Sequence, residues 1–337
     1  MKRFGAYFFG FLAVLCLAAW LCPDQAALAA THKGGKTLPF IGLGGMIINA
    51  GSLQALFKAY RVIFQEAFTG SESQWQKIAT LVPSSGKEQG YPWLGQLSSM
   101  REWIGDRVIQ ALTLHDYTIK NKPFELTVGV LREDIEDDTV GVYNPLFAEM
   151  GRSANAHPDE LVFAQLAAGF TTLCYDGQYF FDTDHPVNGA SVSNSGGGAG
   201  TAWYLLDTTR AIKPIIFQQR KKAEFVALDN PTDQNVFMKK EFLYGVDCRD
   251  NVGFALWQLA YASKQTLDAA AYATARAAMG SLKNDAGRPL NIRPNLMVVP
   301  PSLEGAARKI LQNDRNDAGA ANEWVGTAQV VVASWLA

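Results

Sequence analysis

The chain has 337 residues, of which 48% are hydrophobic and 18% charged, so it can build a sizeable core and is not a disordered or low-complexity protein. Its 30 basic and 32 acidic residues give a formal net charge of -2, which argues against nucleic-acid binding through a broad basic face. Four cysteines and four histidines are too few for a disulfide scaffold or a classical zinc module.

The first 45 residues differ from the rest of the chain. A basic start precedes an apolar run from Ala6 to Cys22, and an A-x-A pattern ends at Ala29, which together predict a secretory signal cleaved near Ala29. A second hypothesis takes Met46 as the true start and residues 1–45 as a misplaced start or a fused short frame. The residues alone leave both hypotheses open.

The segment after Met46 predicts a helix and then a loop-rich stretch. Apolar residues recur at spacings of three and four from Leu53 to Phe68, Ser52 can cap this helix, and Gly70 ends it. The next expected elements are a short extended or helical piece at 75–82, a turn at 83–86, a strand at 91–97 and a charged segment at 101–107.

The middle of the chain predicts two strands and a long helix. Strands are expected at 117–120 and 124–131 around an Asn-Lys-Pro turn. The acidic run at 133–138 is interpreted as a solvated face or the first turn of a helix. Pro145 fits the start of a helix that ends at Gly169, and Pro158 either kinks that helix or starts a second one.

The remaining chain mixes strands and helices without regular alternation, which predicts the α+β class. The Gly/Ser/Asn-rich stretch 188–201 is expected to be a flexible loop, and the Ala-rich stretch 251–279 a helix. The other expected elements are strands at 212–217, 224–228, 238–246, 296–299 and 330–335, and a helix at 303–311 capped by Ser302.

One cluster of side chains could hold a divalent metal. Asp176, Asp182, Asp184 and His185 offer carboxylates and an imidazole close together in sequence, which is a possible set of oxygen and nitrogen ligands. The favoured interpretation is a turn, because Asp, Gly and Pro are turn residues and Asp side chains bond their own backbone.

The other polar residues give weaker signals. His157 has no Cys or His nearby in sequence and is interpreted as structural, whereas Cys174 and Cys248 could form a disulfide or stay free thiols. No nucleophile–base pair follows from the spacing, so we expect neither enzyme activity nor a cofactor. The charged residues that could bind anions, or form ion pairs within or between subunits, are Arg101, Glu102, Asp106 and Arg107.

A series of short motifs follows in order through almost the whole of 46–337. They are YPWLG at 91–95, REWIGDR at 101–107, YTIKNK at 117–122, FELTV at 124–128, REDIEDD at 132–138, MGRSA at 150–154, PDEL at 158–161, CYDGQYFF at 174–181, DHP at 184–186 and RAIKP at 210–214. Through these motifs the chain resembles the major head (capsid) subunit of Mu-like tailed bacteriophages.

The resemblance implies the HK97-type major capsid fold, an α+β fold with four named parts. The implied parts are an N-terminal arm (46–82), an extended loop (83–116), a peripheral domain with a spine helix (117–170 and 294–337) and an axial domain (171–293). A capsid subunit assembles in the host cytoplasm and ends up in the virion. The resemblance therefore favours residues 1–45 as a start-site or fusion artefact that is not part of the fold.

The implied function is structural. Hexamers and pentamers of the chain would close into an icosahedral phage or prophage head around double-stranded DNA, with only weak, non-specific DNA contact. A scaffolding protein, a maturation protease and a portal are implied partners, and the folded body is not expected to enter a membrane.

Aromatic and charged residues of the loop segment are candidates for the subunit interface, because such side chains anchor interfaces. They are Tyr91, Trp93, Arg101, Glu102, Trp103, Asp106 and Arg107. The competing hypotheses are an exported metal-dependent enzyme or binding protein that uses the Asp176 cluster, and a cellular nanocompartment shell of the same fold.

Overall fold

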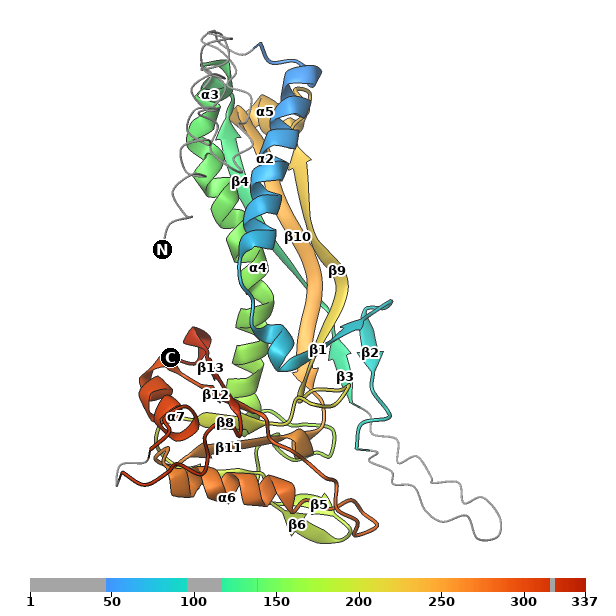
Figure 1. Cartoon of the computed structure of the whole chain (residues 1–337). Helices are drawn as coiled ribbons and strands as arrows, with labels where there is room; N and C mark the ends of the chain where they lie inside the picture. The colour runs from blue at the N-terminus through green and yellow to red at the C-terminus, as the bar shows by residue number, and fades with distance from the viewer. Residues whose placement is uncertain (1–46, 96–116, 138, 316–318) are drawn as a thin grey trace, which may run out of the picture. The chain divides into compact units, whose positions relative to one another are not determined.

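The computed structural model describes residues 47–95, 117–137, 139–315 and 319–337 (Figure 1). The expected signal or mis-started segment, residues 1–45, lies outside the described residues, and so does the charged segment 101–107. Strands and helices mix in the described part, in agreement with the α+β class.

A long four-stranded sheet has the strand order β1-β9-β10-β4 (Figure 1). β10 is antiparallel to β4 and β9, whereas β1 pairs in parallel with β9. The strands expected at 212–217 and 224–228 are one strand, because the chain between them also pairs with β10. The strands are β1 (Ala79–Pro83), β4 (Lys122–Leu131), β9 (Ile215–Leu228) and β10 (Glu241–Phe254).

Two long helices, α2 (Ala50–Gly70) and α4 (Asn144–Ala167), pack against each other, and α4 also packs on the sheet (Figure 1). The expected helix at 53–68 is confirmed, but its cap is Asn49 and not Ser52. The Asn49 side chain accepts the Ser52 backbone N–H at 2.9 Å, and the Ser52 hydroxyl accepts the Asn49 N–H at 3.0 Å. This reciprocal pair is a capping box, in which Ser52 is the third helical residue.

Helix α4 confirms the helix expected from Pro145 and is followed by the 3-10 helix η4 (Ala168–Phe170). Pro158 lies inside α4, and the helix continues through it. Gly151 is buried where α4 meets α2, and a Cβ at this position would lie 2.4 Å from the carbonyl oxygen of Phe64. The missing side chain therefore allows the two helices to approach closely.

A five-stranded sheet has the order β13-β12-β8-β11-β7. The helices α6 (Ala269–Gly280) and α7 (Glu304–Leu311) pack against its strands. The helix expected at 303–311 is confirmed, but the 3-10 helix η6 (Pro301–Leu303) precedes it, so Ser302 is not its cap. The strands are β7 (Ser195–Gly198), β8 (Trp203–Leu206), β11 (Ala260–Lys264), β12 (Leu296–Val299) and β13 (Gln329–Val332), and the 3-10 helix η7 (Ser334–Leu336) follows β13.

Two expectations in this region are wrong. The stretch 251–279 is not one helix: it contains the end of β10, the 3-10 helix η5 (Trp257–Leu259), β11 and most of α6. The stretch 188–201 is not only a loop, because it contains β6 (Ala190–Val192), which pairs with β5 (His185–Val187), and β7. Burial in a sheet overrides the helix propensity of alanine in the first case.

The remaining elements are short. The strand expected at 91–97 is wrong for its described part, because residues 92–95 form a turn. The strands expected at 117–120 and 124–131 are confirmed as β3 and β4, but they pair with different partners and not with each other. The strand expected at 238–246 begins later, because α5 occupies its first residues. These short elements are η2 (Trp75–Lys77), β2 (Glu88–Gly90), β3 (Thr118–Lys120), α3 (Arg132–Glu136), η3 (Val140–Tyr143) and α5 (Gln234–Lys239).

Two hydrophobic cores lie within the described residues. One core is enclosed by α2, α4, the last part of β9 and the first part of β10. The other core is built around the five-stranded sheet. β12, α7 and β13 share the second core with β8 and β11, so the two cores divide the described chain differently from the expected domain segments. No helix in the described ranges is both long and apolar enough to cross a membrane.

Candidate assembly interface and buried polar clusters

The two ends of the segment expected to be an extended loop are joined by a pair of strands, β2 and β3, which we call the base of the loop. β2 and β3 are antiparallel, with Glu88 opposite Lys120 and Gly90 opposite Thr118. The chain between them therefore leaves and returns at the same place. Of the candidate interface residues in this segment, the structure describes two and leaves five outside the described residues: Arg101, Glu102, Trp103, Asp106 and Arg107.

Tyr91 and Trp93 stand at this base in different environments. Tyr91 is buried, its hydroxyl donates to Gln218 Oε1 at 2.7 Å, and burial raises its pKa to about 12. Gln218 in turn donates to the Asn121 side chain at 2.7 Å, so three buried polar groups fix the start of the segment. Trp93 contacts the Tyr91 ring edge-on and is 39% exposed, which leaves it available to a partner.

A second surface of interest is an exposed apolar end of the long sheet. Phe237 and Met238 of α5 are 85% and 68% exposed. Helix α5 lies beside α3, because the Arg132 N–H donates to the Lys240 carbonyl at 2.8 Å and Lys240 pairs with Glu133 at 3.2 Å (Figure 1). Large exposed apolar side chains in one region mark protein–protein contact sites.

The metal cluster that was the less favoured interpretation of the sequence is only partly assembled. His185 is fully buried, its Nδ1 lies 2.7 Å from Asp176 Oδ2, and its Nε2 lies 3.2 Å from Asn194 Oδ1. Burial opposes ionisation of Asp176, but the hydrogen bonds from His185 and the Cys174 thiol outweigh it and lower the pKa of this carboxyl. The pair is therefore a closed polar network that holds the turn in the core.

Asp182 and Asp184 do not join this network as ligands. Asp182 accepts the backbone N–H of Thr183 at 2.7 Å, and Asp184 is exposed. Asp176 likewise accepts the N–H of Gln178 at 3.1 Å. Both carboxylates thus bond backbone groups close to them in sequence, which supports the turn interpretation over the four-residue metal site.

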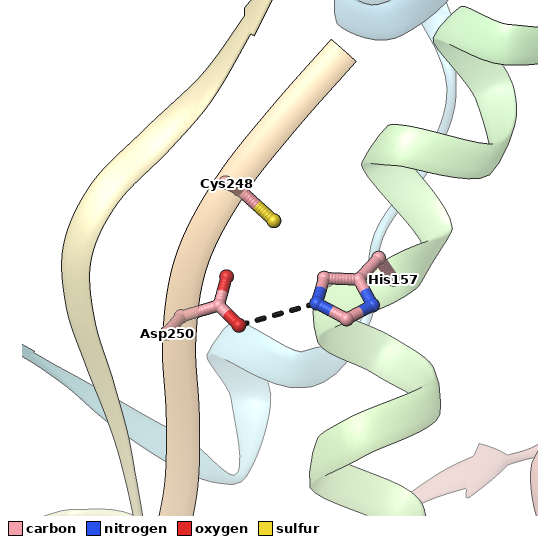
Figure 2. Close-up of side chains that lie close together, drawn as sticks. All are labelled: His157, Cys248 and Asp250. Atoms are coloured by element: carbon pink, nitrogen blue, oxygen red, sulfur yellow. Dashed lines mark hydrogen bonds and ion pairs between the residues drawn. The ribbon is translucent and has the colours of Figure 1, made fainter. Parts of the chain in front are cut away.

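A further cluster was missed in the sequence (Figure 2). His157 of α4 points toward Cys248 and Asp250 of β10, and its Nε2 lies 3.2 Å from Asp250 Oδ1. The available signal was the Cys-x-Asp spacing on a strand, which places both side chains on one face. The helix that supplies the imidazole is far away in sequence, so spacing alone could not join the three.

Both cysteines in the described part of the chain are free, so the possible disulfide between Cys174 and Cys248 does not form. Burial raises the pKa of the Cys174 thiol above its ordinary value, with a further contribution from Asp176. Burial and the neighbouring Asp250 raise the pKa of Cys248 to about 12. Both thiols are therefore protonated at neutral pH and are poor nucleophiles.

Comparison with known proteins gives consistent matches. A family model described as the Mu-like prophage major head subunit gpT matches residues 53–336. The chain is 47% identical over 274 residues to the Mu-like prophage FluMu major head subunit of Haemophilus influenzae, covering 78% of this chain and 89% of that protein. It is 43% identical over 305 residues to the major capsid protein of Escherichia phage Mu, covering 86% and 100%.

A solved structure is similar over the same extent. The subunit in the procapsid of bacteriophage JBD30 superposes with a TM-score of 0.77 and 46% sequence identity, covering 86% of this chain and 100% of that one.

Proposed function

This chain belongs to the family of Mu-like prophage major head subunits and is a structural capsid subunit with an HK97-type α+β fold, and on that premise we propose how it assembles. Copies of the chain form hexamers and pentamers, and these close into an icosahedral head that encloses double-stranded DNA. The proposed role is geometric and not catalytic, and it needs no cofactor.

The observation that carries this proposal is the exposure of large apolar side chains on the single subunit. Phe237 and Met238 are mostly exposed at one end of the long sheet, and Val142 of the neighbouring η3 is 75% exposed. Burying such side chains against a second copy would remove about 25 cal/mol of unfavourable free energy for each Å² of apolar surface. A shell of identical chains supplies a partner for this end in every subunit.

The extended loop supplies a second proposed contact. The pairing of β2 with β3 brings the two ends of the expected loop together, which supports this assignment, and Trp93 is exposed at that base. We assign Trp93, with Arg101, Glu102, Trp103, Asp106 and Arg107, to contacts with a neighbouring subunit. Buried Tyr91 contacts the Trp93 ring edge-on.

The segment assignments follow the same proposal. The arm is residues 46–82, the loop is 83–116, the peripheral domain is 117–170 with 294–337, and the axial domain is 171–293. In the fold, α2 of the arm packs on α4 of the peripheral domain, and the two hydrophobic cores include residues from more than one of these segments. Assembly takes place in the host cytoplasm with a scaffolding protein, a maturation protease and a portal, and residues 1–45 are not part of the working protein.

Particle formation tests the proposal. The full chain is expressed with its neighbouring phage genes, and the pelletable fraction is examined by negative-stain electron microscopy and sedimentation. Icosahedral particles that contain this chain are expected, and a chain found only as a small soluble species would refute the proposal. Phe237→Ser should reduce the particle yield while the circular dichroism of the subunit stays unchanged, and the matched control Phe237→Leu should retain particles.

A further inference from the structure

A cluster of three metal-binding side chain types lies between helix α4 and strand β10 (Figure 2). Cys248 and Asp250 occupy alternate positions of β10 and face His157 across the interface. The register of β10 against β9 shifts between Asp247 and Asp250, as expected of a bulge. Bulges re-aim side chains, and here the irregularity lies at the two strand residues of the cluster.

The spacing of the three groups suits a transition metal ion. A ring nitrogen of His157, the Cys248 Sγ and an Asp250 carboxylate oxygen all lie within 4.8 Å of one another. Zinc binds nitrogen and oxygen at about 2.0–2.2 Å and thiolate sulfur at about 2.3 Å, which places tetrahedral ligand atoms about 3.3–3.8 Å apart. The 3.2 Å between His157 Nε2 and Asp250 Oδ1 is already close to that separation.

Room for an additional ligand adjoins the cluster. A cavity of about 90 Å³ is lined by His157, Cys248, Phe124 and Val246. Such a volume holds a water molecule, which catalytic and open zinc sites commonly keep as a fourth ligand. The Asp250 side chain is only 2% exposed and that of His157 is 18% exposed, so an ion bound there would be largely shielded from solvent.

We propose that His157, Cys248 and Asp250 form a binding site for a divalent transition metal ion, with zinc as the best match to this ligand set. Binding transfers the thiol proton of Cys248 to solvent, and a sulfur–metal bond replaces the S–H bond with no change of oxidation state. The thiolate and the carboxylate then balance the two positive charges of the ion. The bound ion would tie α4 to the long sheet.

The second cluster of the same residue types provides a contrast. Both ring nitrogens of His185 already face oxygen atoms of Asp176 and Asn194, and the ring stacks on Trp257 at 3.9 Å. The Cys174 thiol donates to Asp176 at 3.0 Å. Because both ring nitrogens of this histidine are already held by oxygen atoms and the ring is fully buried, we do not propose a metal there, and Cys174 serves as a matched control thiol.

Cobalt binding tests the site. The full-length protein is stripped with a chelator and titrated with Co²⁺, whose thiolate complexes absorb strongly. One Co²⁺ per chain with a sulfur charge-transfer band is expected, together with release of one proton. Cys248→Ser should lose the band, and Cys174→Ser should keep it.

Zinc competition measures the other two ligands. His157→Gln and Asp250→Asn should each weaken Zn²⁺ binding by more than about tenfold. Removing a residue that only hydrogen-bonds to a metal ligand already costs about tenfold or more, so removing a ligand itself should cost at least as much. Circular dichroism establishes that each variant is folded before titration. Absence of the band in the folded protein, or a band that survives in Cys248→Ser, would overturn the proposal.

Discussion

The close crossing of α2 and α4 predicts that Gly151→Ala destabilises the subunit. An added Cβ would lie 2.4 Å from the Phe64 carbonyl oxygen and 3.0 Å from the Ala67 Cβ. The first contact is about 1 Å shorter than the 3.4 Å at which ordinary contact begins. Because the obstructing atom belongs to a helix backbone, it cannot turn away as a flexible side chain would, and the helices must separate.

The expected magnitude follows from two opposing effects. Overpacking costs about 1–3 kcal/mol, and the rigid obstruction places this variant at the upper end. Alanine regains about 1 kcal/mol of helix propensity over glycine, so the net loss is about 2 kcal/mol. With a urea dependence of about 2 kcal/mol per molar, the unfolding midpoint should fall by about 1 M.

Urea unfolding of the unassembled subunit, followed by circular dichroism, measures this shift. Gly305→Ala is the matched control, because Gly305 lies in α7 with nothing within 4 Å of an added Cβ, and it should be neutral or stabilise by up to about 1 kcal/mol. If Gly151→Ala unfolds at the same urea concentration as the natural chain, the two helices do not cross as closely as described.

Three further predictions concern single side chains. Trp93→Ala should leave the unfolding midpoint of the subunit unchanged and lower the particle yield in sedimentation, whereas equal yields would remove Trp93 from the interface. Tyr91→Phe leaves the buried Gln218 oxygen without its hydroxyl donor and should cost about 1–3 kcal/mol in urea unfolding; an unchanged midpoint would contradict the buried network. Asp176→Asn should destabilise the subunit at pH 7, because the folded state lowers the pKa of this carboxyl. Its stabilising effect is full above the unfolded pKa of about 4 and is lost as pH falls through the lower folded pKa, so thermal unfolding of the variant and the natural chain should converge in acid; a constant gap would refute this.

Periodic helices and short apolar strands could be predicted from the sequence. The three- and four-residue spacing of Leu53, Leu56 and Tyr60 predicted α2, and the start of α4 followed from Pro145. These elements have one apolar face whose period is visible without knowledge of its partner. The apolar run at 296–299 was recognisable as β12 for a different reason, because a short continuous apolar run is typical of a fully buried strand.

Segments governed by tertiary pairing could not be predicted. Ala260 and Ala262 are fully buried in β11, although alanine favours helices, because β11 pairs with β8 on one side and β7 on the other within a buried sheet. Gly196 was taken for a loop residue, yet it belongs to β7, where a Cβ would lie 2.6 Å from Ser263 Oγ. Neither requirement is visible before the partner strand is known.

The candidate site shows the same limit. Asp176 and His185 were grouped as possible metal ligands because they are near in sequence, and the two side chains do contact each other, but Asp182 bonds backbone groups and Asp184 is exposed. The cluster around His157 forms because β10 packs beside α4, and no local sequence pattern indicates that packing.

The parallel pairing of β1 with β9 has a consequence for synthesis of the chain. The last residue of β1, Pro83, lies opposite Gln219 of β9. More than a hundred residues must therefore be synthesised after β1 before its partner strand exists. At about 5–20 residues per second, synthesis of that interval takes about 7–27 seconds. Throughout this time β1 presents unpaired backbone groups on the nascent chain, because only a strand from much later in translation completes its hydrogen bonds. Pairing of β1 therefore waits at least until residue 219 has been made, and a slow step set by this long-range closure is built into the topology.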